Sequence, residues 1–165
     1  MRWLLVDRID TLVPDSHVEG VKTFSLSEPW FQDHFPGFPV VPGVLLLESM
    51  AQIAGKLIGF SVRRARGDWP FPIFTMADRV KFRRFVRPGQ VVTLHSEIYS
   101  LREESAQMKS TSRVDGRVVA QAEQTFVFNA VPLEEAEDRK TLEGLEHRAL
   151  RILWADCPVD PPQGP

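Results

Sequence analysis

Cysteine is almost absent from this sequence, since Cys157 is the only one among 165 residues. A single cysteine excludes an intramolecular disulfide framework and a cysteine-rich zinc site. No uninterrupted apolar run reaches the ~18 residues that a membrane-spanning helix needs, and the first residues lack the pattern of a signal peptide. We therefore expect a cytoplasmic protein that does not insert into a membrane.

The sequence also lacks the common short motifs of nucleotide, phosphate and metal chemistry. It contains no GxGxxG, no GxxxxGK, no GxSxG and no HExxH pattern. Its histidines show no metal-ligand spacing: they are His17, His34, His95 and His147. We therefore expect neither a metal ion nor a cofactor.

Neither sign of charge dominates, because 20 basic and 22 acidic residues give a net charge of −2. This balance argues against a general nucleic-acid-binding protein. The charge is unevenly distributed, however: residues 63–87 carry a net +6, which leaves −8 for the rest of the chain. Such a run is usually a solvated surface, but it can also attract an acidic partner.

The length fits one folded domain. A loop rich in proline, glycine and aromatic residues ends at Gly43, and about twenty residues with almost no helix breakers follow. Most of this predicted helix is apolar, which indicates that other structure surrounds it. Alternating or short apolar segments predict strands over Trp3–Ile9 (or a brief helix there), Val21–Leu26, Ile73–Phe85, Val91–Leu101, Ala106–Val114 and Val118–Phe128. Four strands in series favour an antiparallel sheet around one buried helix, an α+β fold.

The composition changes after residue 132. We expect a main domain over residues 1–132 and an amphipathic helix over residues 133–155. Residues 156–165, with four prolines, are predicted to form a disordered tail. The apolar face of the helix would consist of Leu142, Leu145, Ala149, Ile152 and Leu153.

Two residues are candidates for acid–base chemistry. His34 lies in the proline-rich loop, where it could simply be a polar loop residue. Glu48 lies in the apolar helix and forms an i, i+4 series with Gln52 and Lys56, as an exposed polar stripe would. If the helix were buried on all sides, desolvation would favour the protonated carboxyl group and suit it to act as an acid. Periodicity alone leaves both alternatives open.

The combined string HFPGFPVVPGVLLLESMAQ resembles the pattern of FabZ-type 3-hydroxyacyl-[acyl-carrier-protein] dehydratases. That pattern is His-Phe-Pro-Gly-x-Pro, then Pro-Gly-Val at the start of a helix, then Glu-x-x-Ala-Gln. These parts lie at His34–Pro39, Pro42–Val44 and Glu48–Gln52. Further matches are LVDR at Leu5–Arg8, KFRRFVRPG at Lys81–Gly89 and DGRVVAQAE at Asp115–Glu123, so the resemblance spans roughly residues 3–128.

The resemblance implies the hot-dog fold, an antiparallel sheet wrapped around one long central helix. It implies a homodimer, or a trimer of dimers, with the histidine from one protomer and the glutamate from the other in each active site. The implied reaction converts a (3R)-3-hydroxyacyl thioester into the trans-2-enoyl thioester during fatty-acid or related lipid or polyketide biosynthesis. His34 would be the base and Glu48 the acid, or His34 would make both proton transfers.

The resemblance also suggests supporting residues. The N–H group of Gly43 or Val44 would face the developing enolate oxygen, and Gln52 would orient the Glu48 carboxyl group. An acidic acyl carrier protein would dock on the basic stretch formed by Arg79, Lys81, Arg83, Arg84 and Arg87.

Two departures from the family pattern keep other functions open. Asp33 stands where the family usually has glycine, and the lead-in that includes a channel-lining tyrosine is missing. The alternatives are a hot-dog thioesterase that acts on acyl-CoA and a catalytically silent hot-dog subunit that binds acyl chains or pairs with an active partner.

Overall fold

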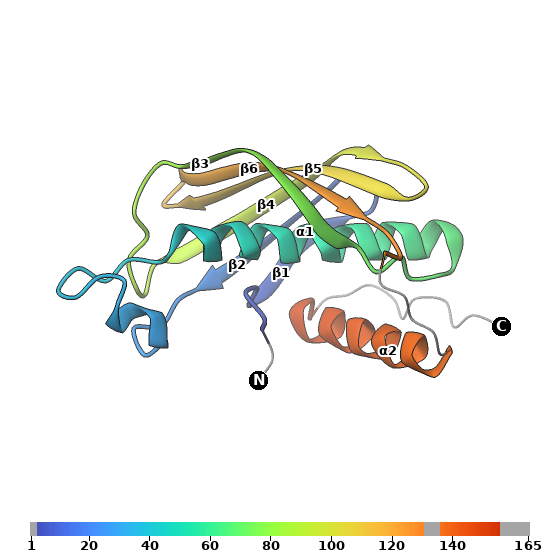
Figure 1. Cartoon of the computed structure of the whole chain (residues 1–165), viewed down its shortest axis with the longest axis horizontal. Coiled ribbons are helices and arrows are strands. Elements are labelled where there is room, and N and C mark those ends of the chain that lie inside the picture. The colour runs from blue at the N-terminus through green and yellow to red at the C-terminus, as the bar shows by residue number, and fades with distance from the viewer. Residues whose placement is uncertain (1–2, 131–135, 156–165) are drawn as a thin grey trace.

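A single long helix lies along a six-stranded antiparallel sheet in the computed structural model, which describes residues 3–130 and 136–155 (Figure 1). The strands are β1 (Arg8–Val13), β2 (His17–Thr23), β3 (Ile73–Phe82), β4 (Val91–Leu101), β5 (Ser105–Val114) and β6 (Arg117–Val127). The helices are a 3-10 turn at Pro29–Gln32, α1 (Gly43–Arg66) and α2 (Ala136–Leu153). The strand order is β1-β2-β4-β5-β6-β3, so β1 and β3 are the two edges.

Helix α1 begins and ends as the sequence predicts. Pro42 precedes its first residue, and Gly67 ends it with a φ of 84°, a left-handed conformation that glycine adopts without strain. One side of α1 is fully buried against the sheet, at Met50, Ile53 and Leu57 among others. The sheet wrapped around this helix is the hot-dog arrangement that the resemblance implies.

A chain of buried polar side chains fixes α1 on the sheet. Ser96 on β4 and Ser110 on β5 are 2.8 Å apart at their hydroxyl oxygens, and the Ser110 hydroxyl donates to Gln124 Oε1 over 2.8 Å. Gln124 Nε2 then donates to the carbonyl oxygen of Leu47 on α1 over 3.2 Å. Because a buried polar group is costly without a partner, this chain defines where the helix sits along the strands. It holds the backbone directly before Glu48.

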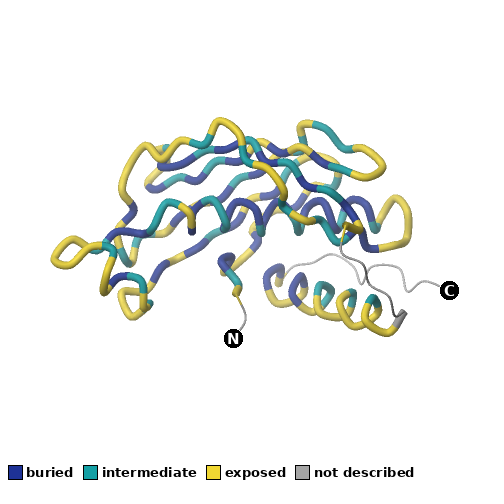
Figure 2. The backbone as a smooth tube through the Cα atoms, in the orientation of Figure 1, coloured by how far each residue is buried: buried dark blue, intermediate teal, exposed yellow. Residues whose placement is uncertain are grey.

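Helix α1 is not buried on all sides, which corrects the sequence-based expectation. Val44 is 65% exposed, and Glu48, Gln52 and Lys56 are half-buried on a side that the sheet does not cover. The N-terminal segment and α2 lie on this side instead, as Figure 1 shows. Figure 2 shows that the loop before α1 is mostly exposed at one end of the molecule.

Several predicted strand boundaries were wrong. Residues 3–7 form no regular strand, and β1 begins at Arg8 because the Leu5 N–H group donates to the Gln52 side chain rather than to a neighbouring strand. The second strand starts at His17, where it pairs with β1 across a tight turn. The strand predicted to reach Phe85 ends at Phe82.

Helix α2 covers most of the predicted C-terminal helix, but its apolar face differs. Ile152 is 62% exposed, whereas Leu150 and Trp154 are buried in its place. Trp154 packs edge-on against Phe60 of α1, with ring centroids 5.6 Å apart. The tail predicted for residues 156–165 lies outside the described residues.

By length and hydropathy alone, α1 also has the character of a membrane-spanning helix. Its most apolar 18-residue window has a mean hydropathy of 1.3, although Glu48 and Lys56 interrupt the apolar run of α1. Within the fold, 56% of that window is buried. Core helices of globular proteins share this character, and α1 is the core helix here.

Candidate active site

The Glu48 carboxyl group is held by a hydrogen-bonded amide one turn further along α1. Gln52 Nε2 donates to Glu48 Oε1 over 2.9 Å and to the Trp3 carbonyl oxygen over 3.1 Å. Gln52 Oε1 accepts from the Leu5 N–H group over 2.7 Å. Three hydrogen bonds therefore fix the amide, and the amide fixes one oxygen of Glu48. For the second oxygen, Oε2, the described part of the chain offers no hydrogen-bond partner.

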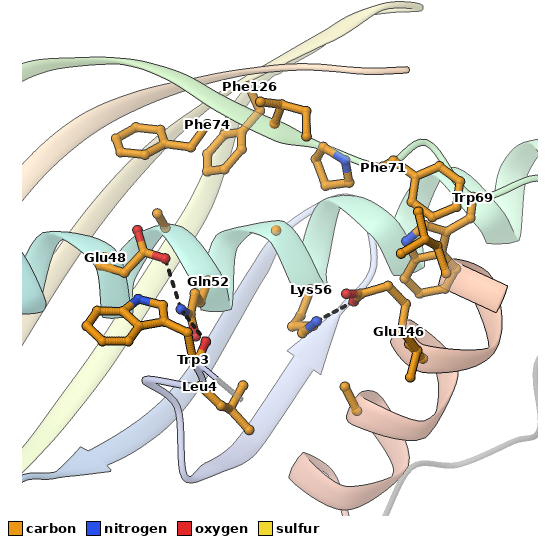
Figure 3. Close-up of a pocket in the computed structure, with 17 residues that line it drawn as sticks. Trp3, Leu4, Glu48, Gln52, Lys56, Trp69, Phe71, Phe74, Phe126 and Glu146 are labelled. Atoms are coloured by element: carbon orange, nitrogen blue, oxygen red, sulfur yellow. Dashed lines mark hydrogen bonds and ion pairs between the residues drawn. The ribbon is translucent and has the colours of Figure 1, made fainter. Parts of the chain in front are cut away.

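Glu48 lies at one end of a cavity of about 520 Å³. The walls of this cavity are mainly apolar and include Trp69, Phe71, Phe74 and Phe126. In the view of Figure 3, Phe74 and Phe126 lie above α1, on the side of the sheet, and Gln52 lies below it. A volume of this size lies within the range of small-molecule sites, roughly 300–1,000 Å³.

Further along α1 the cavity has a polar wall, between Glu48 and Trp69. Lys56 Nζ on α1 forms an ion pair with Glu146 Oε2 on α2 (Figure 3). The Lys56 side chain is 11% exposed and that of Glu146 is 36% exposed. The cavity therefore carries a carboxyl group with a neutral partner at one end and a neutralised ion pair further along its wall.

His34 is fixed by the loop that precedes α1. Its Nδ1 lies 3.0 Å from the Val40 carbonyl oxygen, and its own carbonyl oxygen accepts from the Val40 N–H group over 3.0 Å. A carbonyl oxygen can only accept, so this hydrogen bond places the ring proton on Nδ1 and leaves Nε2 as the basic nitrogen. The ring stacks on Phe35 with centroids 4.3 Å apart.

The structure does not bring His34 into the cavity that Glu48 lines. Of the predicted site residues, Glu48 and Gln52 both line this cavity, whereas His34 lies in the loop before α1, outside it. Asp33, which departs from the family pattern, is exposed, and its N–H group donates to the Trp30 carbonyl oxygen. No ion pair between Asp33 and His34 occurs within residues 3–130 and 136–155.

The start of α1 offers backbone donors. The N–H group of Leu45 already donates to the Pro42 carbonyl oxygen over 2.9 Å, and no side chain caps the helix. The N–H groups of Gly43 and Val44 precede it, at the positive end of the helix dipole. A Cβ atom on Gly43 would lie 3.0 Å from the Phe82 ring of β3, so glycine permits this close approach.

The predicted docking residues lie on β3 and the loop after it, and all are exposed: Arg79, Lys81, Arg83, Arg84 and Arg87. Arg79 pairs with Glu123 over 2.9 Å, and Arg83 donates twice to Gln121 on the neighbouring strand. Arg87 lies over the Phe38 ring at 4.7 Å. Because β3 is an edge strand, this basic row has no further strand beside it in the sheet.

Sequence reasoning missed the N-terminal anchor and the far wall of the cavity. Trp3 and Leu5 bind Gln52 through backbone atoms, which no side-chain pattern reveals. The pairing of Lys56 with Glu146 joins residues 90 positions apart. The available signals were the polar stripe that contains Lys56 and the position of Glu146 among the apolar residues of its helix, but neither signal indicates a partner.

A family model described as a FabA-like domain matches residues 1–123. A FabZ 3-hydroxyacyl-[acyl-carrier-protein] dehydratase from Caldicellulosiruptor saccharolyticus is 41% identical over 76% of this chain and 88% of its own length. The enzyme of the same name from Syntrophotalea carbinolica is 40% identical over 76% of this chain and 84% of its own. The chain belongs to the FabZ-type FabA-like family.

Solved structures support the fold of this FabZ-type chain. The dehydratase heterocomplex ApeI:P from Xenorhabdus doucetiae superposes with a TM-score of 0.64, 16% identity and coverage of 85% of this chain and 88% of that one. A hypothetical thioesterase with coenzyme A from Streptococcus pneumoniae gives a TM-score of 0.57, 17% identity and coverage of 74% and 87%. At such identities the likeness concerns the fold, and the predicted hot-dog fold is confirmed.

Proposed function

We propose that this chain removes water from (3R)-3-hydroxyacyl groups carried on acyl carrier protein, giving the trans-2-enoyl thioester. The observation that carries this proposal is the Glu48 carboxyl group, held by Gln52 at the end of an apolar cavity. The names of the FabZ relatives support it, because each denotes this dehydration. The setting is fatty-acid or a related lipid or polyketide biosynthesis, and the cytoplasmic location stays a prediction.

His34 acts first, as the base. Its Nε2, free because Nδ1 is bonded to Val40, takes a proton from C2 of the acyl chain. The electron pair left on C2 delocalises onto the thioester oxygen, where negative charge develops. The N–H groups of Gly43 and Val44 face this oxygen at the positive end of α1 and stabilise the charge.

Glu48 then acts as the acid. Its second oxygen carries a proton to the C3 hydroxyl group, the C3–O bond breaks, and the hydroxyl leaves as water while the C2–C3 double bond forms. The imidazolium of His34 and the carboxylate of Glu48 remain. A net proton transfer from the former to the latter, through solvent, restores the resting site.

A second copy of the chain completes each site in this proposal. His34 does not line the cavity that holds Glu48, so the histidine of one protomer serves the glutamate of the other. The free edge strand β3 supports edge-to-edge pairing, because most of its residues are exposed and it ends beside Gly43. Whether three such dimers assemble further stays a prediction.

An acidic acyl carrier protein docks on the basic row of β3 in this proposal. The row lies next to the start of α1, where Phe82 covers Gly43. A carrier bound there would place its prosthetic arm close to the proposed thioester site. Long-range attraction between the acidic carrier and the exposed arginines accelerates encounter and weakens with salt.

Product analysis tests the proposed reaction. Purified protein should convert 3-hydroxyacyl carrier protein into the enoyl form, seen by mass spectrometry as loss of one water. His34→Ala should abolish this conversion, and His17→Ala, a matched change on β2, should not. Release of a free acid would instead indicate a thioesterase, and absence of turnover in the wild-type protein would indicate a silent subunit.

A further inference from the structure

Helix α2 lies outside the part of the chain that matches the family. The family model ends at residue 123, whereas α2 begins at Ala136. Nevertheless, α2 contributes four side chains to the cavity that begins at Glu48: Leu142, Leu145, Glu146 and Ala149. An element beyond the matched region thus forms one wall of the proposed active-site cavity (Figure 3).

We propose that α2 and the Lys56–Glu146 ion pair form a polar barrier across the acyl-chain site and limit the length of the acyl chain. This inference rests on the proposed function for the identity of the occupant, an acyl chain whose C3 lies at Glu48. The apolar walls suit an alkyl chain, since burial of each methylene is favourable by the hydrophobic effect. The ion pair does not suit an alkyl chain, because a methylene group cannot replace the water that hydrates the two charged groups.

The distance from Glu48 to the ion pair gives the length. Lys56 lies two turns beyond Glu48 on α1, which is about 12 Å along the helix axis. With C–C bonds of about 1.5 Å in zigzag, an extended chain of roughly ten carbons spans this distance. Acyl chains of up to about twelve carbons in total therefore fit between the proposed acid and the ion pair, and longer chains must displace it.

Gly55 gives a direct way to shorten the cavity. It lies on α1 between Glu48 and Lys56 and lines the cavity, and a Cβ atom there would meet only Pro72, at 3.9 Å. Gly55→Leu therefore fills the cavity without a backbone clash. Gly144→Leu on α2 is the matched control, because a Cβ atom at Gly144 meets nothing within 4 Å and the residue does not line this cavity.

The probes are acyl pantetheine amides of four, twelve and sixteen carbons, which bind without reacting, with affinity measured by calorimetry. Wild-type protein should bind the twelve-carbon probe most tightly. Gly55→Leu should weaken that binding about tenfold relative to binding of the four-carbon probe. Gly144→Leu should leave the ratio of the two affinities, twelve-carbon to four-carbon, unchanged. Gly55→Ala, with folding checked by circular dichroism, should shift the ratio in the same direction by less.

The double variant Lys56→Ala/Glu146→Ala removes the polar barrier. It should improve binding of the sixteen-carbon probe relative to the twelve-carbon probe. Equal affinities for all lengths, no binding of any probe, or a Gly55→Leu protein with wild-type ratios would overturn the inference even if dehydration is observed. Length-dependent binding without dehydration would uphold the cavity assignment and instead contradict the proposed function.

Discussion

The cavity beside α1 and the basic edge strand β3 present opposite kinds of surface. The cavity is lined mainly by aromatic and aliphatic side chains and holds few polar groups, each with a defined partner. The edge strand is exposed along most of its length and carries arginines whose partners lie at the surface. Low polarity strengthens electrostatic interactions inside the cavity, whereas water and salt screen those on the strand. In the proposed function, the chemistry therefore belongs to the cavity, and long-range attraction of the carrier protein belongs to the strand.

This difference predicts where each substitution acts. Changes at Glu48 or Gln52 should lower kcat for every substrate, whether or not it is attached to a carrier protein. Changes on β3 should affect KM for carrier-bound substrates and leave a small thioester analogue unaffected.

The largest effect is expected for Glu48→Gln, which keeps the shape of the side chain but removes its acidic proton. A general acid typically contributes about 10²–10⁴-fold, so kcat should fall by that factor on both carrier-bound and pantetheine substrates. Glu143→Gln on α2 is the matched control and should retain wild-type kcat. A Glu48→Gln enzyme within about threefold of wild type would instead assign both proton transfers to His34.

Gln52→Leu should have an intermediate effect, because it removes the amide that positions Glu48. Misplacement of a catalytic group costs up to about a hundredfold, and we expect a loss of roughly tenfold or more in kcat. KM for the pantetheine substrate should change little, which separates positioning from a general loss of folding. Gln107→Leu, the same change at an exposed position on β5, provides the reference. A fall in melting temperature with unchanged kcat would show that Gln52 only anchors the N-terminal segment.

The smallest effect is expected on β3, from the double charge reversal Arg83→Glu/Arg84→Glu. KM for the carrier-bound substrate should rise about tenfold at low salt, and its dependence on salt should weaken. The kinetics of the pantetheine substrate should stay at the wild-type level. Equal losses on the two substrates would show that these arginines act in the fold or the active site rather than in carrier docking.

Much of the fold follows from local patterns in the sequence. Pro42 and Gly67 define the ends of α1, and the alternation along β4 matches its observed bounds. The N-terminal segment was predicted less well because Leu5 is anchored by a side chain on α1 instead of a strand. The exposure of Ile152 was missed because the helical period alone does not say which of two overlapping apolar stripes meets the core.

The residues of the candidate site were predicted from the sequence, but the shape of the cavity was not. The motif around His34 and Glu48 predicts the chemistry, and the structure adds the hydrogen bond from Gln52 to Glu48. The α2 wall of the cavity includes Glu146, which pairs with Lys56 and lies in a helix beyond the matched family region. No local pattern encodes such a long-range contact, so the extent of the cavity emerged only from the fold.

The central claim is that each active site combines His34 of one protomer with Glu48 of another. Co-expression of His34→Ala and Glu48→Gln chains with different affinity tags, followed by two-step purification, isolates the mixed dimer. Each mixed dimer then contains one site with both native residues, so its kcat should reach about half the wild-type value while each variant alone stays inactive. A mixed dimer as inactive as its two parents would contradict the account, because both residues would then have to come from the same chain.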